Sequence, residues 1–344
     1  MINQTQQMTY RLSILDAQQQ RNSYQLATGK QIDNGSEDSV LYSREVLVDD
    51  KIRTYEGLEK QLERTQVQNN AADSSISEIK SILEYVKAEL IKANTSTTSD
   101  AGLKSIAVNI EGMKQNLLDL ANTRIEGEYV FSGSDSSVQP FSEDINGKIT
   151  YDGNNKLRRV AVEEGSYRER GITGLDLMMY SSSTAYKGET LTFNDTDRVV
   201  DQDGNEWQLN SPTNDTLTRY DLDGNVTSDT LSVTSDGLTP AIYSFTAPMT
   251  DGVKFEAKTN IFNLFDDIVN NLNMLDNDGN PISSTLAREN IGNVQAKITD
   301  AFDSVNVMHA ELGAKNKVFE VSLESVSSKL TQYNILSINL GSAD

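Results

Sequence analysis

The sequence predicts an α+β protein: an elongated antiparallel helical coiled coil or bundle formed by both chain ends, with an inserted β-rich domain. Two observations support this class. Apolar residues recur at alternating spacings of three and four near both ends of the chain. Between residues 131 and 258 this periodicity disappears, and short β-favouring runs separated by Gly-containing turns replace it. We therefore expect an N-terminal assembly helix and hinge over 1–39, a helical rod domain over 40–130 with 259–344, and a surface-exposed β-rich domain over 131–258.

The stretch QLATGKQIDNGSEDS, residues 25–39, contains a Gly-Lys pair that invites comparison with a phosphate-binding loop. Such a loop requires Gly-x-x-x-x-Gly-Lys-Ser/Thr, because backbone N–H groups cradle the phosphates and the hydroxyl meets Mg²⁺. Here Gln31 follows Lys30, and the first glycine of the pattern would fall on Tyr24. No strand-like run precedes the pair, so a nucleotide loop is excluded.

The same stretch instead indicates a hinge between two helices. Gly29 can end a helix in the left-handed conformation, and Asn34-Gly35 favours a turn. Ser36 is then a candidate cap for the next helix. The helix before the hinge carries an apolar stripe, which we expect to serve in assembly, made of Met8, Leu12, Leu15 and Leu26.

A long helix is predicted from about residue 40 to 93, roughly 80 Å at 1.5 Å per residue. Its seam is Val48, Ile52, Tyr55, Leu58, Leu62, Thr65, Asn69, Ala72, Ile76, Ile79, Leu83, Val86 and Leu90. The helix-poor stretch 93–102 interrupts the pattern. A second seam follows, with Leu103, Ile106, Ile110, Met113, Leu117, Leu120 and Arg124. Two seams joined by a short connection indicate an antiparallel helical hairpin.

Helical periodicity returns near the C-terminus. A short amphipathic helix is indicated by Ile261, Leu264, Phe265, Ile268, Leu272 and Leu275. A long one follows with Ile291, Val294, Ile298, Phe302, Val305, His309, Leu312, Asn316, Phe319, Leu323, Val326, Leu330 and Tyr333. The polar residues on the two long seams cost stability but can fix the register of the helices.

The middle of the chain contains β-favouring runs and tight-turn signals. The runs are KITY, RRVAV, ETLTF, RVV, EWQL, LSVT, AIYSF and VKFEA. Two Asp-x-Asp-Gly-Asn segments, 201–205 and 221–225, lie between such runs and predict hairpin turns, because glycine tolerates positive φ. A third, 276–280, separates two helices and is expected to be a loop. None fits a calcium-binding EF-hand, which needs Gly at its sixth position and Glu at its twelfth.

Composition and charge exclude several functions. The formal net charge is −21, which disfavours binding to nucleic acid and to anionic membranes. There is no Cys and only one His, His309 on a helical seam, so we expect no enzyme, no cofactor and no metal site. Residues 1–25 lack a basic start followed by an apolar core, so we expect no cleaved secretory signal peptide. No run approaches the length of a membrane span.

The segment QLATGKQIDNGSEDSV resembles the helix–hinge–helix pattern of the flagellin superfamily, apart from Asp33-Asn34 where the family usually has a single Asn. Within that superfamily, GEYVFSGSDSSVQPF (127–141) resembles the Gly-x-Tyr-x-Phe-x-Gly segment leading to Pro-Phe of the hook–filament junction family. The family motif is carried by Tyr129, Phe131, Gly133, Pro140 and Phe141. YDGNNKLRRVAVEEG resembles the hairpin that follows. The resemblance covers residues 1–160 and about 286–344.

The resemblance implies a structural role: a protein of the bacterial flagellum that joins hook to filament by helical self-assembly and partner assembly. Implied partners are copies of itself, the first hook-associated protein, flagellin and an export chaperone. The implied location is extracellular, on the flagellum. Family members continue past a segment like NILSINLGSAD into a last helix that pairs with the first one. Without that helix we expect a frayed N-terminus and a monomeric chain.

Two alternatives stay open from the sequence. The chain could be a flagellin that forms the filament itself, although the Tyr129–Phe131 element is unusual for flagellins. It could also be a surface-displayed carbohydrate- or host-binding module on a helical stalk, with Trp207 and nearby tyrosines as a sugar platform. A lone Trp is more often a packing residue.

Overall fold

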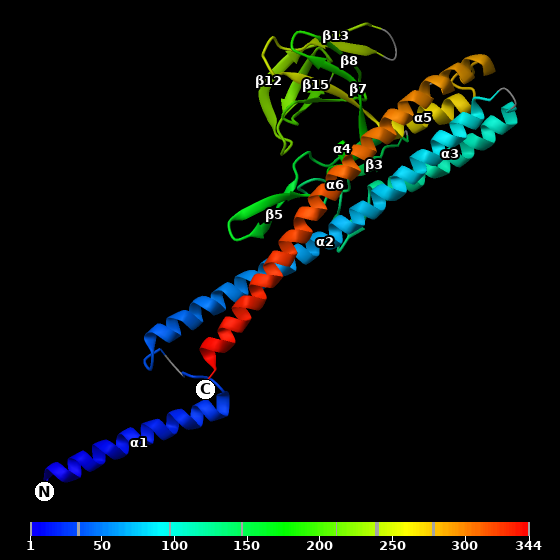
Figure 1. The fold of residues 1–344 in the computed structure, drawn as a ribbon. Coiled ribbons are helices and arrows are strands. Elements are labelled where there is room, and N and C mark those ends of the chain that lie inside the picture. Colours follow the sequence, from blue (N-terminus) through cyan, green and yellow to red (C-terminus); the bar gives the residue numbers. More distant parts are fainter. Residues whose placement is uncertain are drawn as a thin grey trace. The chain divides into compact units, whose positions relative to one another are not determined.

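A computed structural model of the chain describes residues 2–32, 35–95, 98–145, 147–210, 212–237, 241–276 and 279–342 (Figure 1). The chain divides into two compact units. The first unit comprises Met1–Arg64, Val160–Arg168 and Val318–Asp344. The second unit comprises Thr65–Arg159 and Glu169–Lys317.

The helices follow the apolar seams of the sequence. They are α1 (Ile2–Thr28), α2 (Ser39–Ala93), α3 (Asp100–Ala121), α4 (Gly174–Met178), α5 (Ile261–Leu272) and α6 (Ser284–Gly341). The prediction of a long helix over about 40–93 is confirmed by α2, which has 55 residues. The C-terminal seam lies within α6, a single helix of 58 residues.

In the first unit, the tip of a β-hairpin packs against the two long helices. The hairpin pairs β5 (Arg158–Glu163) with β6 (Ser166–Arg170), and we call residues 160–168 the hairpin tip. Two valines of the tip are buried in an apolar cluster with α2 and α6 side chains: Tyr55, Leu58, Leu62, Val160, Val162, Phe319 and Val326. Tyr55 also stacks on Tyr333, with ring centroids 5.4 Å apart. The seam residues of both helices therefore meet at this cluster.

Carboxylates at the hairpin tip add ion pairs to both helices. Glu164 pairs with Lys51 of α2 at 2.6 Å, and Glu163 pairs with Lys329 of α6. These side chains are partly exposed, so the buried valines are expected to contribute more to stability than the charges.

In the second unit, α2, α3, α5 and α6 share one apolar core. Figure 1 shows α3 running back along α2, as the predicted helical hairpin requires. The seam residues from Ala72 to Leu90 are buried there, together with Leu103, Ile110 and Leu117 of α3. The seam does not extend to Arg124, contrary to the sequence expectation. Helix α3 ends at Ala121, and Arg124 is exposed in a two-stranded ladder of β1 (Arg124–Ile125) with β2 (Glu128–Tyr129).

Two charged side chains stabilise this helical core. Lys114 of α3 is buried and pairs with Asp266 of α5, with 2.5 Å between Nζ and Oδ1. Arg288, near the start of α6, donates to the backbone carbonyls of Ala93, Thr95 and Thr98 at 3.0, 2.9 and 2.5 Å. Carbonyls at the end of a helix have no intrahelical donor, so Arg288 satisfies groups that would otherwise depend on water.

The second unit also contains a six-stranded and a three-stranded antiparallel sheet, in addition to a two-stranded ladder of β3 (Phe141–Glu143) with β4 (Ile149–Tyr151). The six-stranded sheet has the order β12-β11-β10-β9-β15-β7, and the three-stranded sheet has the order β13-β14-β8. The strands are β7 (Met179–Tyr186), β8 (Thr190–Asn194), β9 (Arg198–Asp201), β10 (Glu206–Leu209), β11 (Thr216–Tyr220), β12 (Val226–Ser232), β13 (Thr234–Ser235), β14 (Ile242–Thr246) and β15 (Lys254–Asn260). An aromatic-rich core fills the space between the sheets, with Phe193, Trp207, Tyr243, Phe245 and Phe255.

Candidate assembly surface and the 127–141 motif

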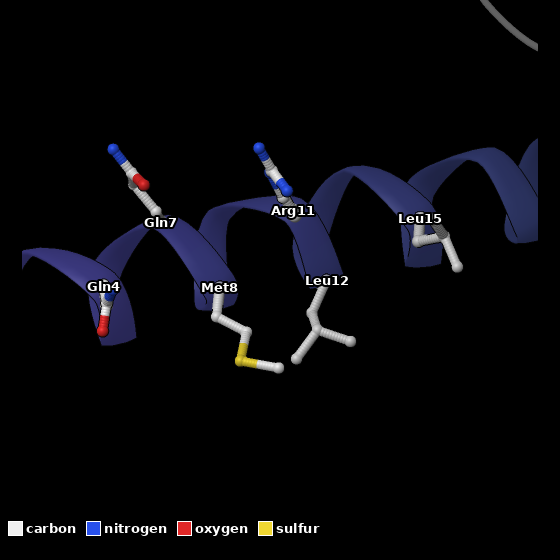
Figure 2. Close-up of a pocket in the computed structure, with 6 residues that line it drawn as sticks. All are labelled: Gln4, Gln7, Met8, Arg11, Leu12 and Leu15. Carbon is white, nitrogen blue, oxygen red and sulfur yellow. The ribbon is translucent and has the colours of Figure 1, made fainter.

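Helix α1 presents an uncovered apolar stripe. Met8, Leu12, Leu15 and Leu26 are 68, 62, 64 and 88 % exposed. Figure 2 shows Met8, Leu12 and Leu15 on one side of α1, while Gln7 and Arg11 point to the other. Helix α1 is continuous from Ile2 to Thr28. Its composition accounts for this, since Gln, Leu, Met and Ala are good helix formers even without a buried face.

The hinge begins where α1 ends. Gly29 has φ +69° and its N–H donates to the Gln25 carbonyl at 2.8 Å, so a glycine ends the helix as the sequence predicts. Beyond it, the Gln31 N–H donates to the Gly341 carbonyl of α6 at 2.8 Å. The chain is thereby held beside the end of α6.

The second half of the hinge differs from its prediction. The proposed turn residue Asn34 lies outside the described residues. Gly35 packs closely on α2, because a Cβ there would lie 2.9 Å from Cδ1 of Tyr42. The cap of α2 is Asp38, not Ser36: its Oδ1 accepts the N–H groups of Val40 and Leu41, both at 3.0 Å. An Asp cap also places negative charge at the positive end of the helix dipole.

The 127–141 motif is a folded module in the second unit. Phe131 and Phe141 are fully buried, and Pro140, which directly precedes Phe141, is also buried. The Phe141 ring packs against Tyr151 at 5.2 Å and against Phe262 of α5 at 5.5 Å. The aromatic residues of the motif thus join the end of the helical hairpin to α5.

Backbone groups of the motif are satisfied by neighbouring side chains. Asn122, just after α3, donates to the Phe141 carbonyl and accepts the Phe141 N–H, both at 2.9 Å. The Phe131 carbonyl accepts the Gly174 N–H at 2.7 Å and the Tyr151 hydroxyl at 3.2 Å. Burial raises the pKa of Tyr151 far above its usual range, so this hydroxyl remains a donor.

Two motif positions depend on special contacts. Gly133 has φ +83°, and a Cβ there would lie 2.2 Å from the Asn154 carbonyl oxygen. No other residue type fits that position without displacement of the backbone. Tyr129 is paired with Arg124 across β1 and β2, and the guanidinium carbon lies 5.3 Å from the ring centroid.

The structure therefore places the predicted residues in two separate sets. The stripe and hinge residues belong to the first unit, and Tyr129, Phe131, Gly133, Pro140 and Phe141 belong to the second. The residues that support the second set were not identified from the sequence: Asn122, Tyr151, Asn154 and Gly174. Asn154 follows Asp152-Gly153, and this turn signal indicated a turn at that position in the sequence.

The Asp-x-Asp-Gly-Asn segments form hydrogen bonds within their own turns. Segments 201–205 and 221–225 are the hairpin turns between β9 and β10 and between β11 and β12, as predicted. In each, the first carboxylate accepts the N–H groups two and four residues later, at 2.8–3.0 Å. In the third segment Asp276 accepts the Asn280 N–H at 2.7 Å. The carboxylates thus already have donors from their own turns.

Other candidate chemistry has a packing explanation. Trp207 is 8 % exposed, packs edge-on against Phe255 and donates Nε1–H to Asp201 at 3.0 Å, so it forms no exposed sugar platform. His309 lies half-buried on its seam, 3.0 Å from Asp73. Within the described ranges, no group of three or more His, Asp or Glu side chains could hold a metal ion, and no helix is long and apolar enough to cross a membrane.

Comparison with known proteins agrees with this arrangement. Residues 2–136 match the bacterial flagellin N-terminal helical region. Flagellar hook-associated protein 3 of Escherichia coli (strain K12) is 29 % identical over 123 residues, covering 35 % of this chain and 38 % of that protein. The Salmonella typhimurium protein of the same name is 26 % identical over 164 residues, covering 47 % of this chain and 50 % of that protein.

A solved structure shares the fold. The flagellar junction protein FlgL from Legionella pneumophila superposes with a TM-score of 0.53 at 20 % identity, covering 88 % of this chain and 100 % of that one. Residues 2–136 are thus similar to the N-terminal helical region of bacterial flagellins. The chain is also similar to flagellar hook-associated protein 3, and the matched part spans half or less of those relatives' own length.

Proposed function

We propose that this chain is a structural protein of the bacterial flagellum that joins the hook to the filament by helical assembly, without catalysis. The observation that carries the proposal is the uncovered apolar stripe of α1, in a region that matches the flagellin N-terminal family. Four large apolar side chains on one exposed helical stripe are costly in water and favour burial against another helix. The names of the two curated relatives favour the junction as the place of assembly.

The proposal assigns a task to each part of the chain. Residues 1–39 supply the assembly helix and hinge, 40–130 with 259–344 the rod, and 131–258 the outward-facing domain. The partners are copies of the chain, the first hook-associated protein and flagellin, with a chaperone during export. Nucleic acid and membranes are not partners, in keeping with the net charge of −21. The protein acts outside the cell.

Immunogold electron microscopy of intact flagella tests the proposal. The antibody is raised against residues 131–258, and we expect gold confined to a narrow band where hook meets filament. Label along the whole filament would instead make the chain a filament-forming flagellin. Label elsewhere on the cell surface would reject both flagellar roles.

A further inference from the structure

The apolar seams of α2 and α6 are interrupted by a short polar stretch. Along α2, three buried polar residues separate Leu62 from Ala72: Thr65, Gln68 and Asn69. Along α6, the seam position between Leu312 and Phe319 is Asn316. We call these four polar residues the polar layer. Leu62 and Phe319 belong to the apolar cluster of the first unit, whereas Ala72 and Leu312 belong to the core of the second.

Asn69 and Asn316 lie at the same level of the two helices. Each falls, on its own helix, between the members of two cross-helix contacts: Asp73 with His309 at 3.0 Å, and Leu62 with Phe319 in one apolar cluster. These contacts also show that the helices run in opposite directions. Because both asparagines occupy seam positions, their amides face the same interhelical space within the second unit.

One amide atom of each asparagine is buried without a hydrogen-bond partner. Asn69 is 3 % exposed, and its Nδ2 donates to no acceptor among the described residues. Oδ1 of Asn316 is likewise buried and accepts from no donor there. Gln68, by contrast, donates to Glu128 at 2.9 Å and accepts from Arg170. Buried polar atoms normally have partners, so the unmatched donor and acceptor destabilise the closed helix pair at this level.

Opening of the helix pair supplies what the closed arrangement lacks. When α2 and α6 separate at the polar layer, water can bond to both unmatched amide atoms, whereas separation at an apolar level exposes hydrocarbon to water. The polar layer is therefore the least costly level at which to interrupt the pairing. The division between the two compact units falls beside it in both helices, at Arg64–Thr65 and at Lys317–Val318.

We propose that the polar layer divides the pairing of α2 with α6 into two segments that open separately. The segment of the first unit, 39–64 with 318–341 and the hairpin tip, opens while the core around Ile76 and Leu83 stays folded. Gln31 of the hinge is bonded to Gly341 at the end of α6, so opening of this segment also releases the hinge. Helix α1 then becomes free to take a new orientation.

Hydrogen–deuterium exchange of the full chain, followed peptide by peptide with mass spectrometry, tests this. We expect 45–62, the hairpin tip and 319–335 to share one exchange rate, about tenfold or more faster than 76–90 and 294–312. The rate should change in a step between Leu62 and Ile76, since fraying from the helix ends would give a gradual change instead. The double variant Asn69→Leu, Asn316→Leu removes both unmatched amides and continues the apolar seam. It should slow exchange of the first segment about tenfold.

The matched control is Asn70→Leu with Asn334→Leu, which makes the same substitutions at exposed positions of the same two helices. It gives the same gain in helix propensity but leaves the polar layer intact, so exchange should slow about twofold at most. One common rate for both segments of the parent chain, or a gradual change along the helices, would overturn the proposal. So would equal slowing by the control. The proposal does not depend on the flagellar role, so gold at the junction can be found with either exchange pattern.

Discussion

Gly133 shows how strongly one residue of the 127–141 motif constrains the fold. Gly133→Ala combines a left-handed backbone with a Cβ 2.2 Å from the Asn154 carbonyl oxygen. We expect a loss of about 3 kcal/mol of stability. Thermal unfolding followed by circular dichroism measures it. Gly165→Ala is the control: its φ is +76° but nothing lies within 4 Å, so it should cost only about 1 kcal/mol. Equal losses would refute the packing argument.

The pKa values of two aspartates in the β-rich part should be shifted in opposite directions. Burial raises the pKa of Asp197, and the Asn225 backbone N–H lowers that of Asp221. The folded chain thus holds the Asp197 proton to higher pH than the unfolded chain. The stability that Asp197 contributes is present at low pH and is lost as pH rises through its pKa in the folded chain. The stability that Asp221 contributes is present at higher pH and is lost as pH falls through its pKa in the folded chain.

Carboxyl carbon NMR, with Asp197→Asn and Asp221→Asn to assign the signals, measures both pKa values. Thr259→Val removes a donor to the ionised Asp197 and should raise that pKa further, because the hydroxyl favours the charged form. The pKa of Asp221 should not respond to it. An Asp197 pKa below the ordinary aspartate value would contradict the burial argument.

Side-chain roles at this scale were only partly predictable. Gly29 was identified from the sequence because a Gly after a helical run is a strong stop signal. The cap of α2 was assigned to Ser36, whereas Asp38 performs it. Both are good caps, and only the start of the helix at Ser39 decides between them. Asn122 could not be predicted, since its partner Phe141 is remote in sequence and meets it only in the folded chain.

At the scale of elements, the hairpin tip offers a direct comparison of packing with charge. Val162→Ala should cost about 1–2 kcal/mol, because Val162 is 7 % exposed among α2 and α6 side chains. Glu163→Gln, its neighbour, removes the pair with Lys329 and should cost under about 1 kcal/mol. Denaturant unfolding of the two variants measures the difference. A larger loss for Glu163→Gln would show that the ion pair is the main attachment.

Helices were more predictable than strands. The long seams repeat over many turns, so their periodicity is unambiguous. Strands β6, β7 and β11 were missed because SYRER, MYSSSTAY and TLTRY are rich in polar residues or lack clear alternation. The second seam was extended to Arg124 because spacing alone does not show that the chain leaves the helix at Ala121. The packing of the hairpin tip on α2 and α6 depends on contacts remote in sequence.

For the molecule as a whole, assembly should depend on the apolar stripe of α1 while folding should not. The double change Leu12→Glu, Leu15→Glu adds charge where both side chains are more than 60 % exposed. We expect an unchanged melting temperature and no functional flagella in a strain that carries only this variant. Swarming on soft agar and electron microscopy measure the outcome.

The matched control adds the same charge to polar positions of α1 through Gln7→Glu and Gln18→Glu. Figure 2 shows Gln7 opposite Met8 and Leu12. Motility should persist in the control. If both double variants abolish swarming, added charge anywhere on α1 is sufficient, and the stripe has no special role.

The α+β class was predictable at this scale, while the cavity between β7, α5 and α6 was not. The helical periodicity near both ends of the chain and its loss between residues 131 and 258 were sufficient to predict the α+β class. The cavity is lined by residues scattered from Tyr180 to Asp300 on strands, a turn and two helices. Individual carboxylates in a chain with 51 acids carry no signal until folding gathers them.

The composition of the first unit also bears on the order in which a growing chain becomes able to fold. Tyr55, Leu58 and Leu62 leave the ribosome early, but their cover includes Phe319 and Val326, more than 250 positions later. Until Phe319 and Val326 have been synthesised, this apolar surface lacks its full set of intramolecular contacts. Pairing over such sequence separations is slow, and the exposed interval favours aggregation.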